Sequence, residues 1–280
     1  MKPGQASQTA VLVCMGRAAA HDMPWANGFA DPTALALLPD SARERVERYR
    51  AGIVPRGRAR IGHNYIDRQS RIMVARTMAI DAAIREAAAP QVVILGAGLD
   101  GRAWRMAELR DATVFEVDHP DSQRAKRKRV DALEQRAREV RFVAVDFSRD
   151  DLDAALAAAG HDATRATTWI WEGVVMYLTQ AEIEASLAVI RRRSASGSRL
   201  VIVYHAPALI LAVVGLVVRR LGEPLRSAFK PGAMRALLAS YGFRTVRDED
   251  IPTIGAQLSA DVARKARVAR HLRVVTADRI

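Results

Sequence analysis

The chain has 280 residues, half of them hydrophobic, and is long enough to bury the core of one large α/β domain. Its formal net charge of +12 would attract anionic partners, but the arginines are spread over the whole chain without a nucleic-acid-binding module, so we expect no nucleic acid partner. Cys14 is the only cysteine, which excludes an intrachain disulfide and a CxxC zinc site, favours a reducing, cytoplasmic location and gives no reason to expect a metal.

The first third of the chain predicts helices. Residues 1–60 combine Ala-rich stretches with frequent Pro and Gly and predict an irregular helical cap, and residues 62–89 predict a helix that ends before Pro90. A regular alternation follows, in which short apolar, β-branched runs predict strands at Gln91–Leu95, Thr113–Val117, Arg141–Val145, Thr168–Trp171 and Arg199–Tyr204. The segments between them predict helices, among them Asp121–Arg138, Leu152–Ala159 and Gln180–Arg193.

The strands are almost continuously apolar, which fits a parallel sheet covered by helices on both faces. Near the C-terminus, Pro231–Tyr241 predicts a helix, and Phe243–Val246 with Leu272–Val275 predicts an antiparallel hairpin. The sequence therefore predicts an α/β fold: a Rossmann-like doubly wound sheet, mostly parallel, with a C-terminal antiparallel strand pair and a helical N-terminal extension. We expect residues 1–280 to form a single domain with residues 61–280 as its core.

The apolar segment Leu200–Val218 approaches the length of a membrane span. Tyr204, His205 and Pro207 divide it into a β-branched run and a separate Ala/Leu/Val run, and proline disfavours a helix through the residue before it. We expect a strand, a turn and a buried helix here, and no membrane span.

The segment Gly96–Gly101 reads G-A-G-L-D-G and matches the dinucleotide-binding pattern GxGxxG. It follows a predicted strand and precedes a predicted helix, which is the context in which such a loop lets a ligand approach the backbone closely. The loop alone does not choose the ligand, since NAD, FAD and S-adenosylmethionine all bind at this corner of a Rossmann-like sheet.

Acidic residues in the loop and at the strand ends narrow that choice. Asp100 would repel a pyrophosphate but not a cofactor that carries an amino group and a sulfonium. Asp118 ends the second strand, where it can accept from ribose hydroxyls, and Asp146 with Phe147 ends the third, where the pair can contact adenine. Glu172 ends the fourth strand on the ligand side of the sheet. Turn or helix-capping roles are the alternative for each residue, but together they favour a cationic methyl donor, S-adenosylmethionine.

Several longer strings occur in order over residues 8–275: Ala75-Arg76-Thr77, VVILGAGLDGRAWRM from Val92, VFEVDHP from Val114, VDF at 145–147, WIWEGVVMYLT from Trp169, LGEP at 221–224 and Tyr241-Gly242-Phe243. With this ordered set the chain resembles the leucine carboxyl methyltransferase-like family, especially its bacterial branch of S-adenosyl-L-methionine-dependent O-methyltransferases. The resemblance implies a class I methyltransferase fold and S-adenosyl-L-methionine as the cofactor.

The resemblance also implies which residues hold the cofactor. Arg76 would pair with the methionyl carboxylate and Glu172 would face the methionyl amino group. Asp118 would hold the ribose hydroxyls, and Asp146 with Phe147 would contact adenine. The full set of implied cofactor-binding positions is Arg76, Gly96, Gly98, Asp100, Asp118, Asp146, Phe147 and Glu172.

Two positions depart from the family pattern. Gly101 replaces the Thr, Ser or Ala that is common in the family, which makes the loop look more like a dinucleotide site. Arg17 is a possible counterpart of a basic residue that contacts the cofactor in eukaryotic relatives, but its spacing differs and it is not among the implied positions.

Methyl transfer from a sulfonium is an in-line displacement, in which the protein mainly aligns an oxygen nucleophile and excludes water. We predict methylation of a carboxylate or hydroxyl on a small, hydrophobic acceptor, because residues 1–60 and the apolar run Leu209–Val218, within a substrate-side insert near 205–230, are expected to cover the site. A hydroxyl acceptor would benefit from a general base, for which His205, Tyr177 and His119 are candidates.

Two other functions stay open on the sequence alone. The literal GxGxxG match fits an NAD(P)-dependent oxidoreductase, against which Asp100 and the Glu172 string count. The net charge and the basic cluster Arg124–Arg129 fit an RNA-binding protein or an RNA-modifying methyltransferase. The oligomeric state is not predicted.

Overall fold

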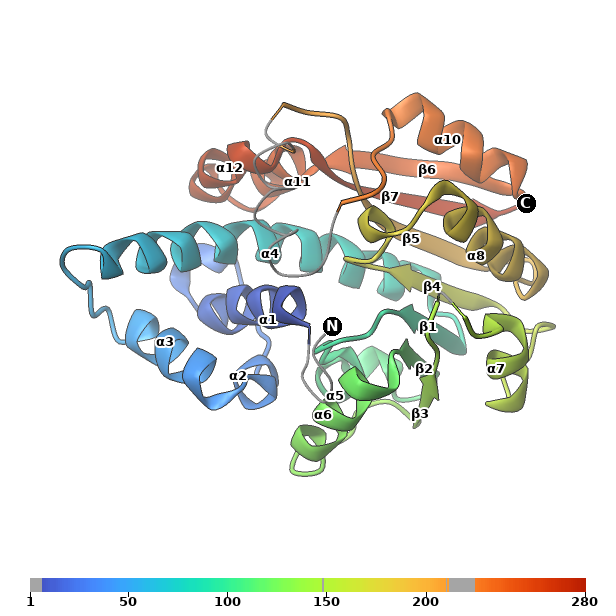
Figure 1. The fold of residues 1–280 in the computed structure, drawn as a ribbon, viewed down its shortest axis with the longest axis horizontal. Coiled ribbons are helices and arrows are strands. Elements are labelled where there is room, and N and C mark those ends of the chain that lie inside the picture. The colour runs from blue at the N-terminus through green and yellow to red at the C-terminus, as the bar shows by residue number, and fades with distance from the viewer. Residues whose placement is uncertain (1–6, 148, 210, 212–224) are drawn as a thin grey trace.

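The computed structural model of the chain describes residues 7–147, 149–209, 211 and 225–280. A seven-stranded sheet with the order β3-β2-β1-β4-β5-β7-β6 runs through the molecule, with helices on both of its faces (Figure 1). Its strands are β1 (Gln91–Leu95), β2 (Thr113–Asp118), β3 (Glu139–Ala144), β4 (Thr167–Trp171), β5 (Arg199–His205), β6 (Phe243–Asp250) and β7 (Leu272–Arg279). This is the predicted doubly wound fold, which is confirmed.

The first five strands are parallel, and β7 lies antiparallel between β5 and β6. The predicted antiparallel pair is therefore present, but the hairpin connection is wrong. Helices α11 (Ile251–Leu258) and α12 (Ala260–Ala266) separate the two strands in the chain. Both helices begin after a side-chain cap, which is Asp250 at the end of β6 for α11 and Ser259 directly after α11 for α12.

The helices that cover the sheet follow most of the predicted bounds. They are α4 (Ala59–Ala87), α7 (Leu152–Ala158), α8 (Gln180–Arg192) and α10 (Pro231–Ser240). The helix after β2 is shorter than predicted: α6 (Pro120–Val130) ends eight residues before Arg138, and the charged residues beyond it form turns. After the glycine loop there is only one helical turn, α5 (Arg102–Arg105), followed by the 3-10 turn η2 (Ala107–Leu109).

The N-terminal segment is helical, as predicted, with α1 (Gln8–Ala20), the turn η1 (Pro24–Ala26), α2 (Ala34–Leu37) and α3 (Asp40–Arg50). Helix α1 packs against α4, and Cys14 and Met15 belong to the same hydrophobic cluster as Val92 and Ile94 of β1. The alternate β1 residues Val93 and Leu95 belong to the cluster on the other face of the sheet. Alternate side chains of one strand thus pack into two different hydrophobic clusters, one on each face of the sheet. This is why the sequences of the strands are continuously apolar.

Strand β5 ends at His205, in agreement with the predicted break before Pro207. Residue 210 and residues 212–218, which make up most of the predicted buried helix, lie outside the described residues. Within the described part of the chain, no helix has the length and apolar character needed to cross a membrane.

Candidate cofactor site

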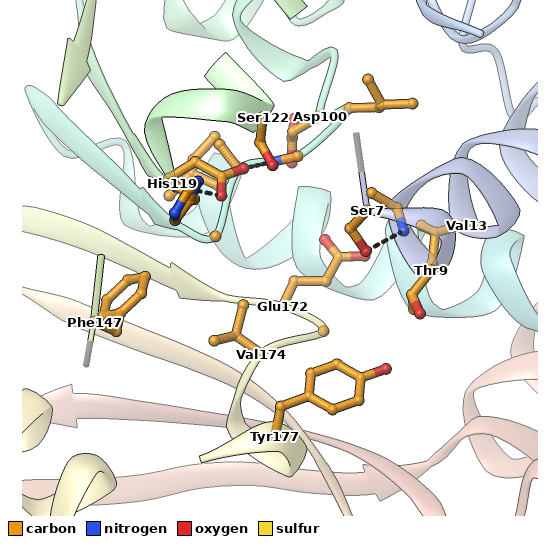
Figure 2. Close-up of a pocket in the computed structure, with 18 of the residues that line it drawn as sticks. Ser7, Thr9, Val13, Asp100, His119, Ser122, Phe147, Glu172, Val174 and Tyr177 are labelled. Carbon is orange, nitrogen blue, oxygen red and sulfur yellow. Dashed lines mark hydrogen bonds between the residues drawn. The ribbon is translucent and has the colours of Figure 1, made fainter. Parts of the chain in front are cut away.

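A cavity of about 510 Å³ opens at the carboxyl ends of β1, β2 and β4, and we call it the strand-end cavity. All eight predicted cofactor positions line it, although they come from segments up to 96 residues apart, Arg76 to Glu172. In Figure 2, Glu172 lies between two groups of lining side chains, with Phe147 and His119 on one side and α1 on the other. Parallel strands bring their carboxyl ends to one edge, and ligands of open α/β sheets bind there.

The glycine loop is held tightly against β2. Gly96 and Ala97 both donate their backbone N–H groups to the Val117 carbonyl, at 2.7 and 3.1 Å. Gly96 has a φ of +72°, and a Cβ at this position would lie 2.1 Å from Cγ2 of Val174. Only glycine fits this turn, and its backbone consequently lies open to the cavity.

Asp118 fixes the end of the same loop. One carboxylate oxygen accepts from the Gly98 N–H at 2.6 Å, and the other accepts from the His119 N–H at 2.7 Å. Burial raises the pKa of Asp118, and these two backbone donors counteract that rise. Each oxygen keeps a second lone pair, so the carboxylate can support the loop and still accept from a ligand hydroxyl in the cavity.

Asp100 lines the cavity, but its carboxylate also binds groups inside the protein. Its carboxylate accepts from the backbone N–H of Arg102 at 2.7 Å and forms an ion pair with the Arg102 guanidinium. Burial alone would raise the pKa of Asp100, but Arg102, Lys126 and Arg17 hold it well below its usual range. The Asp100 charge is thus compensated within the protein, so its repulsion of a pyrophosphate is weaker than the sequence argument assumed.

Glu172 follows β4 and lies between two buried arginines. Its carboxylate contacts the Arg76 guanidinium at 2.6 Å and the Arg102 guanidinium at 2.9 Å. Burial would raise the pKa of Glu172, but these two arginines lower it, so the carboxylate is ionised at neutral pH. Among the described residues, no hydrogen-bond partner meets the buried Nε of Arg76. An anion and a cation with unused hydrogen-bonding capacity therefore sit side by side at the cavity wall.

These pairs belong to a longer buried network that the sequence did not reveal. Arg105 contacts Asp31 at 3.6 Å and Asp81 at 2.7 Å, and Asp81 contacts Arg102 at 2.8 Å. The complete network pairs four arginines with four carboxylates: Arg17, Arg76, Arg102 and Arg105 with Asp31, Asp81, Asp100 and Glu172. Arg17, which was left out of the predicted set, lines the cavity and donates to the Leu99 carbonyl at 2.5 Å.

The far side of the cavity holds the third-strand residues. Asp146 pairs with Arg149 at 2.9 Å and lies 3.9 Å from Nε2 of His119. Phe147 is half-buried, packs against the hydrophobic cluster that contains Val145 and Trp171, and also lines the cavity. His119 caps α6, because its Nδ1 accepts from the Asp121 N–H at 3.3 Å. This nitrogen is therefore an acceptor in a capping role, not a base directed at the cavity.

The two other candidate bases, Tyr177 and His205, differ in whether they reach the cavity. Tyr177 lines the cavity, whereas His205 is not among its lining residues. His205 stacks on His271 with ring centroids 5.1 Å apart, and its buried Nδ1 meets no hydrogen-bond partner within the described residues. Burial, followed by the charges of His271 and Arg76, lowers the pKa of His205 to about 4. His205 is therefore neutral at physiological pH.

The sheet order, with β7 inserted antiparallel between β5 and β6, together with a glycine loop at the end of β1, defines a class I methyltransferase fold. Solved structures agree. A DUF574 family protein from Streptomyces avermitilis matches with a TM-score of 0.61 and 14% identity over 98% of both chains. A protein from Thermobifida fusca, provisionally named a methyltransferase, matches with a TM-score of 0.56 and 13% identity over 99% of this chain and 96% of that one.

The chain belongs to the leucine carboxyl methyltransferase family, whose model matches residues 10–191. Two relatives are provisionally named S-adenosyl-L-methionine-dependent methyltransferases. The protein from Streptomyces coelicolor is 45% identical over 132 residues, 46% of each chain, and that from Mycolicibacterium gilvum is 34% identical over 87% of this chain and 73% of its own. The first of these matches spans about half the length of the relative. The match confirms the predicted family, and both relatives are named for the predicted cofactor, S-adenosyl-L-methionine.

Proposed function

We propose that this chain is an S-adenosyl-L-methionine-dependent O-methyltransferase that methylates a carboxylate or hydroxyl of a small, hydrophobic acceptor. The observation that supports it most is the adjacent pair of Arg76 and Glu172 at the wall of the strand-end cavity. A ligand that carries a carboxylate and an amino group on one carbon presents the complementary charges. When such a zwitterion binds, the ion pair between Arg76 and Glu172 is replaced by two ion pairs, one from each residue to the ligand. The ligand has no net charge, so the net charge of the buried network stays unchanged.

We propose the following division of roles. Arg76 holds the methionyl carboxylate, and Glu172 holds the amino group. Asp118 accepts from the ribose hydroxyls while it supports the loop, and Asp146 with Phe147 contacts adenine. Gly96 and Gly98 leave room for the part of the cofactor between its methionyl and adenine ends, because neither glycine carries a side chain into the cavity.

When bound, the cofactor supplies a methyl group on a sulfonium that an oxygen nucleophile displaces in line. The residues of this chain bind, orient and exclude water. A carboxylate acceptor needs no base because it is already anionic, and the name of the family favours this acceptor. For a hydroxyl acceptor, Tyr177 at the cavity wall is the proposed positioning residue, whereas His205, the other candidate base, is not among the residues that line the cavity.

The apolar part of the cavity supports a hydrophobic acceptor. Helix α1 contributes Ala10 and Val13, and the segment after β4 contributes Val174 and Leu178. We propose that residues 1–60 act as a cap over a single domain, since α1 forms one wall of the cavity. Arg226, from the proposed substrate-side insert near 205–230, also lines it.

The cofactor assignment is tested by calorimetry of the full chain with S-adenosylhomocysteine and with NAD. We expect binding of the first and none of the second. Glu172→Gln and Asp118→Asn should each weaken binding by about tenfold or more, because each removes a charged hydrogen-bond acceptor. Asp111→Asn is the matched control, since its side chain is 89% exposed and is not among the residues that line the cavity.

Tight NAD binding without S-adenosylhomocysteine binding would contradict the proposal and favour the oxidoreductase. Circular dichroism of each variant separates a lost contact from a lost fold. If both site variants are folded and bind as tightly as Asp111→Asn, the proposed residue roles are wrong.

The acceptor class is tested by a methyl-transfer screen over carboxylic acids, phenols and short RNAs. We expect product from an apolar carboxylic acid or phenol and none from RNA. Tyr177→Phe distinguishes the two small acceptors: it should leave carboxylate methylation nearly unchanged and should lower the rate with a phenol, because only the phenol has a hydroxyl for Tyr177 to position. Transfer to RNA alone would favour the nucleic-acid alternative.

A further inference from the structure

The turn between α3 and α4 and the first turns of α4, residues 51–65, form a surface that the proposed function does not use, and we call it the hairpin tip. It lies at the left end of Figure 1, at the far end of α4 from the sheet. Ile53 and Val54 are each 56% exposed, Ile61 is 72% exposed and Tyr65 is 43% exposed. Half of the eight exposed large hydrophobic side chains in the described part of the chain are therefore on this one tip.

The hairpin tip is also strongly basic. No acidic residue occurs between Glu47 and Asp67, whereas three arginines lie on the tip, Arg56, Arg58 and Arg60, and two more, Arg48 and Arg50, lie beside it in the last turn of α3. Within the described ranges, no ion pair involves Arg56, Arg58, Arg60 or the neighbouring Arg45. This differs from the basic helix α6, where Arg124 pairs with Asp121. The charge of the tip is uncompensated.

A second cavity, of about 390 Å³, opens on the hairpin tip. Tyr49 and Ile66 form its buried floor, and Arg45, Arg48 and Arg58 stand at its edge. It shares no lining residue with the strand-end cavity. Apolar space that is bordered by guanidinium groups suits a molecule with an anionic head and a hydrocarbon tail.

From this combination we propose that the hairpin tip docks on an anionic phospholipid membrane. Ile53, Val54 and Ile61 enter the boundary between headgroups and acyl chains, while the arginines contact lipid phosphates. A nucleic acid would supply anionic charge but would leave the three aliphatic side chains without apolar partners, since single strands stack on aromatic surfaces. The proposal does not depend on the methyltransferase reaction.

The test is cosedimentation of the full chain with vesicles of phosphatidylcholine alone and with phosphatidylglycerol added. We expect binding only to the anionic vesicles, with a decrease as salt is raised. The Arg56→Gln/Arg58→Gln variant should lower the partition coefficient by about 30-fold, the effect of two charges at an anionic surface. Ile53→Ser/Val54→Ser should lower it by about tenfold or more at unchanged charge.

The control is Arg127→Gln/Lys128→Gln on α6, which removes the same charge from another exposed site. It should retain most of the vesicle binding. An equal loss in this control would show that net charge alone attracts the chain, and would overturn the proposal. Absence of vesicle binding, or binding of a single-stranded RNA through the same arginines with no vesicle binding, would also overturn it. Thermal melting of each variant confirms that the tip variants stay folded.

Discussion

At the residue scale, Gly101 shows how a departure from the family pattern is set by packing. Its φ of −111° is open to any residue, so the backbone does not require glycine. The packing around position 101 does require glycine, because a Cβ there would lie 2.0 Å from Oγ1 of Thr33. That hydroxyl donates to Asp31 at 2.7 Å, and Asp31 belongs to the buried network. The extra glycine therefore reflects contact with the N-terminal segment, not a dinucleotide site.

We therefore expect Gly101→Ala to lower the free energy of unfolding by about 1–3 kcal/mol, the usual effect of overpacking. Urea denaturation measures it. In the Gly101→Ala/Thr33→Ala double variant the penalty should be partly relieved, because the clashing oxygen is gone. Gly232→Ala in α10 is the control: no atom lies within 4 Å of its added Cβ, and alanine favours a helix. Equal losses at positions 101 and 232 would contradict the packing account.

At the element scale, α1 connects the N-terminal segment to the glycine loop through Arg17. This buried side chain pairs with Asp31 at 2.9 Å and donates to the Leu99 carbonyl at 2.5 Å. In Arg17→Met, the buried Asp31 would keep its neutral donors from Thr33 and Ala34, but Arg105, at 3.6 Å, would be its one cationic partner among the described residues. We expect a loss of about 3–5 kcal/mol in the free energy of unfolding, since a buried charge loses its partner. Weaker S-adenosylhomocysteine binding should accompany it, because Leu99 is part of the loop.

The same substitution at the surface supplies the comparison for Arg17→Met. Arg110 pairs with Asp111 at 3.3 Å, and the two side chains are 81% and 89% exposed. Arg110→Met should cost less than about 1 kcal/mol and leave ligand affinity unchanged. Chemical denaturation and calorimetry on both variants measure the two effects. A stable Arg17→Met protein that binds normally would show that α1 does not support the loop.

The elements that the sequence predicted well are those with a strong local signal. Strands β1 and β4 are buried on both faces, so their apolar runs give their bounds within one residue. Strand β6 was predicted to end at Val246 but continues to Asp250, because this outer strand pairs only with β7 and its later residues are polar. Edge strands lack the continuous apolar pattern by which inner strands can be predicted from the sequence.

The candidate site divides in the same way. The glycine and acid positions were predicted because such residues in a loop or at strand ends are local signals, whereas Arg76 was implied only by the family resemblance; all eight positions line one cavity. Apart from Arg76, their arginine partners were missed because pairing depends on contacts between distant segments: Arg102 and Glu172 are 70 residues apart. The Arg102-Ala103-Trp104-Arg105 string next to the loop was the only local hint of these cations.

At the scale of the whole molecule, buried histidines should make stability depend on pH. His161 packs between Phe115 and Trp169, and its Nε2 lies 3.1 Å from Oγ1 of Thr167. Burial, followed by the charge of Arg193, lowers the pKa of His161 from 6.5 to about 4. The unfolded chain therefore binds more protons between these values, and the stability present above pH 6.5 is lost as the pH falls towards 4.

Glu116 acts with the opposite sign, because burial raises its pKa to about 7 and its protonation favours the folded state. The contribution of His161 must therefore be measured as a difference between wild type and His161→Gln. Urea denaturation at a series of pH values should show wild type losing up to about 3 kcal/mol more than the variant between pH 6.5 and 4. Parallel curves would mean that His161 is protonated equally easily in the folded and unfolded chain, and that the core around Trp169 admits the charge.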